Sequence, residues 1–268
     1  MGSQRGKCGN ATPLFDRHTG TIWLAYNLSG ISAQNSAGYR AYSAQLMQSN
    51  DGGLSWLEPR QLPFDNLVFG PGHGIQKQQQ PAEGRLILPG SRAGSSLTIY
   101  SDDAGKTWQA GEALGLGNEN EIAELSDGTL FMATRHNAPV GSPPQPNGRL
   151  HTLSTDGGHS WGKAENDTRI PTPVCQASVL RYGDSGGLLF SNPADDKARV
   201  HMTVRVSQDD GQNWSKSMLV YPGPAGYSQL GALSDGDVVL LYEQGRIEYS
   251  ERISFARIDA AAALLSTK

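Results

Sequence analysis

Charge, cysteine and long apolar runs are all scarce in this sequence of 268 residues. Charged residues make up 18% of the chain and the formal net charge is -4. No stripe of Lys and Arg suggests a nucleic-acid surface, so we expect no nucleic-acid partner. No apolar run approaches the roughly 18 residues of a membrane-spanning helix, so we expect no membrane span. The first seven residues lack an apolar core, and no signal peptide is expected in this chain.

The residues that usually hold metals or cofactors are also sparse. Cys8 and Cys175 lie far apart without CxxC spacing, which argues against a structural metal site and leaves a single disulfide open. The chain has no Walker loop, HExxH, GxSxG or dinucleotide fingerprint. The histidines show no ligand spacing and are interpreted as surface or loop residues: His18, His73, His136, His151, His159 and His201. We therefore predict neither a metal nor a cofactor.

Four Asn-x-Ser/Thr sequons begin at Asn10, Asn27, Asn166 and Asn213. They arise either by chance or because the protein enters the secretory pathway under a signal absent from this chain. The sequence leaves both interpretations open.

Glycine and proline are plentiful, at 33 and 15 residues, which is typical of many short strands joined by turns. One segment type repeats, with the pattern Ser-x-Asp-x-Gly-x-(Ser/Thr/Asn)-Trp. Its first serines are Ser49, Ser101, Ser154 and Ser207, at intervals of 52, 53 and 53 residues. In each box, the Asp carboxylate should cap backbone N–H groups, Gly should supply a positive φ, and Trp should bury its indole under the turn.

Apolar runs flank the boxes and predict strands at residues 21–26, 84–89, 128–133, 187–191 and 238–242. One four-stranded unit per roughly 50 residues is the period of a β-propeller blade. A solenoid is the alternative architecture for such a repeat. Only residues 260–265 suggest a helix.

These boxes occur in a fixed order with further segments, among them Phe69-Gly-Pro-Gly-His-Gly-Ile-Gln, Ala133-Thr-Arg, Arg199-Val-His-Met-Thr and Pro222-Gly-Pro-Ala-Gly-Tyr-Ser. The combination resembles the exo-α-sialidase (neuraminidase) family, most similar to the animal lysosomal sialidase and to bacterial sialidases. The resemblance covers essentially the whole chain. It implies an all-β, six-bladed sialidase propeller, here a single domain over residues 1–268 that lacks part or all of the first blade.

The resemblance also implies a catalytic pair. Sialic acid carries a carboxylate on its anomeric carbon, which would repel a carboxylate nucleophile, and sialidases use a neutral tyrosine. Tyr227 matches this nucleophile. Glu119 matches the glutamate that takes the phenolic proton. Glu121 is a rival for that role, because Asn120 and Glu121 follow Glu119 where the family usually has a small residue and Gln. In an extended strand Glu119 and Glu121 would point to the same face.

Other positions match residues that bind substrate. Arg135 and Arg199 match the second and third arginines of a triad that grips the sialic acid carboxylate, and Arg205 competes with Arg199. Glu243 matches a glutamate that orients the first arginine. The loop of residues 70–76 is expected to line the pocket near the acyl-amino group.

Two parts of the family pattern are absent from this sequence. These are the Phe/Tyr-Arg-Ile-Pro segment with the first arginine and the aspartate that acts as acid and base. Truncation and a degenerate sialidase are the alternatives, and we expect truncation. Arg5 or Arg40 could replace the arginine, and Asp16 or Asp51 the acid, but their sequence contexts do not support this.

The function implied is that of a retaining exo-α-sialidase acting on glycoproteins, glycolipids such as gangliosides, and oligosaccharides. The alternative is a catalytically impaired propeller that binds sialoglycans. Transfer of sialic acid to a sugar instead of water is also open. The resemblance further implies a lysosomal location, with a secreted or extracellular protein as the alternative, and a protective protein partner.

Overall fold

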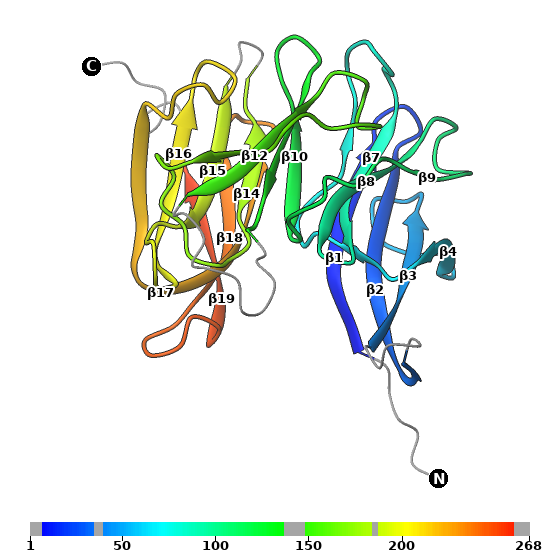
Figure 1. Ribbon diagram of the computed structural model, residues 1–268, viewed down its shortest axis with the longest axis horizontal. Helices are drawn as coiled ribbons and strands as arrows, with labels where there is room; N and C mark the ends of the chain where they lie inside the picture. The colour runs from blue at the N-terminus through cyan, green and yellow to red at the C-terminus, as the bar shows by residue number, and fades with distance from the viewer. Residues whose placement is uncertain (1–6, 35–39, 137–147, 184–186, 260–268) are drawn as a thin grey trace. The chain divides into compact units, whose positions relative to one another are not determined.

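A computed structural model describes residues 7–34, 40–136, 148–183 and 187–259, and these residues are all-β (Figure 1). They contain no α-helix, and therefore none that could span a membrane. The helix expected at residues 260–265 lies outside the described residues. The chain divides into two compact units, one of residues 1–120 and 154–161 and the other of residues 121–153 and 162–268. The single domain expected over residues 1–268 stays a prediction.

The first unit contains two antiparallel sheets. One is a meander of β1 (Lys7–Asp16), β2 (Thr21–Gln34), β3 (Arg40–Ser49) and β4 (Arg60–Asp65). The other has the order β5-β7-β8-β9, with β6 also paired to β7: β5 (Leu67–Phe69), β6 (Ile75–Gln76), β7 (Leu86–Arg92), β8 (Ser95–Ser101) and β9 (Gln109–Ala110).

Two further sheets belong mainly to the second unit. One is a meander of β10 (Asn120–Glu124), β11 (Leu130–Thr134), β12 (Arg149–Ser154) and β13 (Glu165–Asp167). The other runs in chain order through β14 (Ser178–Arg181), β15 (Leu188–Pro193), β16 (Val200–Ser207), β17 (Lys216–Ala232), β18 (Val238–Gln244) and β19 (Arg252–Ile258).

The 17-residue strand β17 joins two meanders into one sheet. Residues up to Pro224 pair with β16, and residues from Ala225 onward pair with β18. All five strands predicted from apolar runs are present, as parts of β2, β7, β11, β15 and β18.

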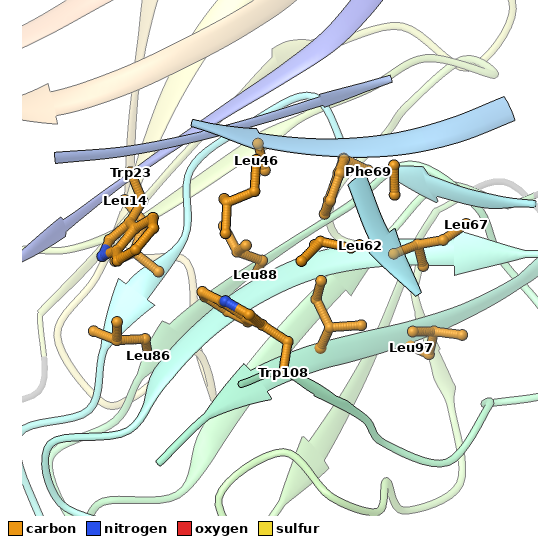
Figure 2. Packing of buried hydrophobic residues seen from close by; sticks show 13 residues of the cluster. Leu14, Trp23, Leu46, Leu62, Leu67, Phe69, Leu86, Leu88, Leu97 and Trp108 are labelled. Carbon is orange, nitrogen blue, oxygen red and sulfur yellow. The ribbon is translucent and has the colours of Figure 1, made fainter. Parts of the chain in front are cut away.

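The pattern of buried and exposed residues along the strands shows where the hydrophobic cores lie. Along β1 the second half alternates strictly between exposed and buried residues, whereas every residue of β11 and β15 is buried. Figure 2 shows the core of the first unit, where Trp23 and Trp108 pack edge to face with ring centroids 6.3 Å apart. Full burial of each large apolar side chain contributes about 1.5–3 kcal/mol.

The four boxes share one set of hydrogen bonds. In the first, the Ser49 hydroxyl donates to Asp51 (2.7 Å) and accepts from the Gly53 N–H (2.9 Å). Asp51 accepts from the backbone N–H (2.9 Å) and hydroxyl (2.5 Å) of Ser55. The same bonds recur at Asp103, Asp156 and Asp209. Each box is therefore closed by its own side chains.

Two details of the boxes differ from the sequence prediction. The turn uses two consecutive residues of positive φ, so Ala104 (φ 55°) adopts the left-handed conformation ahead of Gly105 (φ 82°). Burial of the box tryptophan holds at Trp108, which is 7% exposed, but is wrong at Trp56, which is 36% exposed. The hydrogen bonds of the turn, and not the indole, are the constant feature.

Several polar residues have structural roles. Asn27 is buried, donates to the Leu67 carbonyl (2.8 Å) and accepts from the Phe69 N–H (2.8 Å), so its sequon is inaccessible in the folded chain. This favours chance as the origin of that sequon. The interpretation of histidines as surface or loop residues is wrong for His151, which lies in β12 and stacks on Phe131. Cys8 is exposed and Cys175 is buried, and no disulfide joins them.

Candidate active site

Tyr227 lies on a β-bulge in β17, where the pairing with β18 shifts register between Ala225 and Ser228. Its backbone N–H donates to the Glu243 carboxylate at 2.9 Å. A bulge of this kind re-aims a side chain and is common next to active sites. The Glu243 carboxylate thus accepts the hydrogen bond that a backbone carbonyl of the neighbouring strand would accept in a regular sheet.

Gly226 makes this arrangement sterically feasible. A Cβ at this position would lie 2.3 Å from Glu243 Oε2 and 2.8 Å from Tyr249 Cδ2. Any side chain would therefore displace the carboxylate from the Tyr227 N–H. The glycine in Pro222-Gly-Pro-Ala-Gly-Tyr was visible in the sequence, but its steric role was not.

Gln176 fixes the residue that follows Tyr227. Its side-chain amide accepts from the Ser228 N–H and donates to the Ser228 carbonyl, both at 2.9 Å. Gln176 is 2% exposed. Sequence reasoning missed this residue, and no local signal could have found it, because its partner lies 52 residues away.

Arg199 is the arginine that reaches Tyr227. Its carbonyl accepts from the Ala225 N–H at 2.8 Å, which ties it to the strand just ahead of the bulge. Its guanidinium donates to the Val174 carbonyl (2.9 Å), and the guanidinium carbon lies 5.6 Å from the centre of the Tyr227 ring. The structure thus brings together Tyr227, Arg199 and Glu243.

Arg205, the competitor of Arg199, has a different environment. It is buried and donates to Asn192 Oδ1 at 2.7 Å, and burial lowers the pKa of its guanidinium. A buried arginine held by an internal amide is a structural group, so the geometry favours Arg199. Arg135 is half-buried and directly follows β11 in the second unit, which also contains Arg199 and Tyr227.

The two candidate glutamates differ sharply. Glu121 is fully buried in β10, and its carboxylate accepts from the Val179 N–H at 2.7 Å. Glu119 is half-buried and precedes β10, so the same-face argument for an extended strand does not apply to it. Glu121 therefore has a structural partner in the interior, whereas the Glu119 side chain is partly accessible to solvent.

The loop of residues 70–76 packs against the backbone of Asn120 in the first unit. A Cβ on Gly70 would lie 2.3 Å from the carbonyl oxygen of Asn120, the residue after Glu119. The Thr12 hydroxyl donates to the Gly70 carbonyl at 2.5 Å. The backbone around Glu119 is therefore tightly supported.

The suggested replacements for the missing acid have the wrong electrostatics. Burial would raise the pKa of Asp16, but hydrogen bonds from Thr19, the His18 N–H and Gln76 outweigh it and lower that pKa. The hydroxyl and N–H of Ser55 lower the pKa of Asp51 to about 2. A general acid must be protonated at the working pH, which these turn carboxylates are not. Arg5 and the side chain of Arg40 lie outside the described residues.

The part of the chain that the structure describes contains no group of three or more His, Cys, Asp or Glu side chains placed to hold a metal ion.

Comparison with known proteins identifies the family of this chain. A model of the BNR repeat-like domain matches residues 1–240. A sialidase from Micromonospora viridifaciens is 38% identical over 263 residues, covering 87% of this chain and 39% of that protein. The chain thus spans well under half of that relative's length.

Two solved structures are similar in fold. The Hadza microbial sialidase Hz136 has a TM-score of 0.80 at 24% identity, covering 98% of this chain and 55% of that one. The intramolecular trans-sialidase from Ruminococcus gnavus has a TM-score of 0.81 at 18% identity, covering 98% and 80%. The match over 240 residues establishes the family: the chain belongs to the BNR repeat-like family, and sialidases are among its relatives in both sequence and fold.

Proposed function

We propose that this protein is an exo-α-sialidase that removes terminal α-linked sialic acid from glycoproteins, glycolipids and oligosaccharides with retention of configuration. The observation that carries the proposal is the joining of Tyr227, Arg199 and Glu243 at one bulge. The 38% identity to a curated sialidase supports the same substrate class.

The chemistry follows from the groups present. A guanidinium binds a carboxylate through two parallel hydrogen bonds, so Arg199 and Arg135 would hold the sialic acid anion. The neutral phenol of Tyr227 is not repelled by that anion. Its oxygen would bond to the anomeric carbon as the glycosidic bond breaks, while Glu119 takes the phenolic proton. The leaving oxygen would take a proton from water, because this sequence shows no aspartate in the position of the acid. Water would then release sialic acid and restore the phenol.

In this proposal Glu243 positions other residues and does not react itself. Its carboxylate holds the Tyr227 backbone and would also face an arginine of the substrate site, as the resemblance to sialidases suggests. The fold we propose is a six-bladed propeller in which residues 1–268 belong to one domain.

Apolar side chains accessible on two sheets support the sixth blade. The first sheet carries an open groove of about 350 Å³ lined by Leu24, Tyr26 and Met47, and β18–β19 expose Leu241 and Phe255. A neighbouring blade covers such faces in a closed propeller. An experimental structure of the protein with any other number of blades would contradict this part.

A lysosomal location, with secretion as the alternative, and a protective protein partner complete the proposal and rest on the family resemblance. Colocalisation with a lysosomal marker tests the location. Co-purification of a second protein with the natural-length enzyme tests the partner.

A fluorogenic α-sialoside tests the proposed activity directly. We expect hydrolysis by the wild-type protein and a fall of kcat by about 100-fold or more in Tyr227→Phe, since the nucleophile is removed while the ring remains. Tyr42→Phe, on an exposed tyrosine of β3, is the matched control and should behave as wild type.

The other outcomes separate the alternatives. Binding of sialosides without hydrolysis would indicate the sialoglycan-binding propeller, and a 2,7-anhydro or sugar-linked product would indicate transfer. Unchanged turnover in Tyr227→Phe would refute the nucleophile assignment.

A further inference from the structure

The loop between β18 and β19, residues 245–251, is organised by one carboxylate. Glu251 accepts hydrogen bonds at 3.1, 2.8 and 2.9 Å from the backbone N–H groups of Arg246, Ile247 and Glu248. These bonds, foremost that from Glu248, lower the pKa of Glu251 to about 2. The loop therefore holds its shape at any pH near neutrality.

The start of this loop is fastened to β17. The Gly245 N–H donates to the Pro224 carbonyl (3.0 Å), and the Gly245 carbonyl accepts from the Tyr221 hydroxyl (2.7 Å). A Cβ on Gly245 would lie 1.8 Å from the Glu248 carbonyl oxygen, so the turn is closed as tightly as glycine permits.

This rigid loop places Tyr249 on Arg199. The guanidinium carbon lies 4.5 Å from the centre of the Tyr249 ring, closer than its 5.6 Å from the Tyr227 ring. The ring also packs on the backbone of Gly226, where a Cβ would lie 2.8 Å from Tyr249 Cδ2. Both distances from Arg199 are within the range of a cation–π contact.

We propose that Tyr249 is a positioning residue for Arg199 and that this role rests on the proposed sialidase function. A free arginine side chain samples many rotamers, and fixing one of them on binding lowers affinity. The face of Tyr249 holds the guanidinium beside Tyr227 before substrate arrives. The ring does this through its π-face, so its hydroxyl is dispensable.

Steady-state kinetics on a fluorogenic α-sialoside and calorimetric binding of free sialic acid test this role. For Tyr249→Leu we expect KM and the sialic acid Kd to rise about three- to ten-fold, as for loss of a cation–π contact, with kcat changed less than about two-fold. Tyr249→Phe keeps the ring and should match wild type.

Two further variants keep the test decisive if Tyr249→Leu folds poorly. Glu251→Gln removes the charge that holds the loop and should raise KM, but by less than Tyr249→Leu does. Ile247→Ala alters an 83% exposed side chain of the same loop and should leave KM unchanged.

The outcomes distinguish the inference from the function beneath it. If wild type binds and hydrolyses sialosides but Tyr249→Leu keeps wild-type KM and Kd, the positioning role is refuted and the sialidase proposal stands. A large fall in kcat at constant KM would also refute positioning. If wild type neither binds nor hydrolyses sialosides, the proposed function fails, and the role of Tyr249 fails with it.

Discussion

Replacing the box glycine by alanine should have very different costs in two boxes of the same unit. Gly53 and Gly105 occupy the same box position with φ of 90° and 82°. A Cβ on Gly53 would meet nothing closer than 4.0 Å. A Cβ on Gly105 would lie 2.3 Å from Cζ2 of Trp23, a core side chain that is 5% exposed.

The magnitudes follow from these contacts. An alanine in the left-handed conformation costs about 1–2 kcal/mol, and the stiffer unfolded chain returns about 0.4–1 kcal/mol. Gly53→Ala should therefore lower the free energy of unfolding by about 1 kcal/mol. Gly105→Ala adds overpacking against Trp23, about 1–3 kcal/mol more. Trp23 has little room to yield, because Trp108 packs edge to face against it.

Urea denaturation followed by tryptophan fluorescence measures both variants against wild type. Since both glycines belong to the first unit, their losses refer to the same packed region. Each kcal/mol corresponds to about 2–4 °C in Tm for a domain of 150–250 residues. Equal losses in the two variants would refute the reasoning, because they would mean that contact with Trp23 adds nothing.

Three further predictions concern charge and the candidate site. Because the folded pKa of Asp103 is about 2 against an ordinary 3.8, its contribution to stability is complete above pH 3.8 and is lost as pH falls toward 2. In Asp103→Asn, the urea midpoint should therefore depend less on pH between 2 and 3.8 than it does in wild type. Glu121→Ala leaves the Val179 N–H buried without its acceptor and should lower the free energy of unfolding by about 1–3 kcal/mol, whereas a wild-type urea midpoint would refute the structural role. Gly226→Ala should push Glu243 off the Tyr227 backbone and raise KM for a sialoside, and a wild-type KM would contradict the steric argument.

The repeat could be predicted from sequence because its interactions are local. Ser49, Asp51 and Ser55 satisfy one another within seven residues, so the pattern alone specifies the turn. Exposure of Trp56 could not be predicted, because it depends on which side chains from other strands reach the indole.

Contacts between distant segments bear on the site residues that the sequence left open. The resemblance favours Arg199 over Arg205, and their environments differ in the structure: Arg205 is buried and bonded to Asn192, whereas Arg199 lies beside the Tyr227 ring. The resemblance likewise favours Glu119 over Glu121, and the burial of Glu121 in β10 could not be predicted from the sequence. The hydrogen bonds of Gln176 to Ser228 depend on segments 52 residues apart, beyond any local pattern.

The shared strand β17 affects how the protein opens locally. Its two halves belong to different meanders but to one continuous backbone, so neither meander can detach without disturbing the other. In hydrogen exchange the two should open as one cooperative unit. Tyr227 lies on this shared strand, so its amide should exchange with the same free energy of opening as the amides of both meanders.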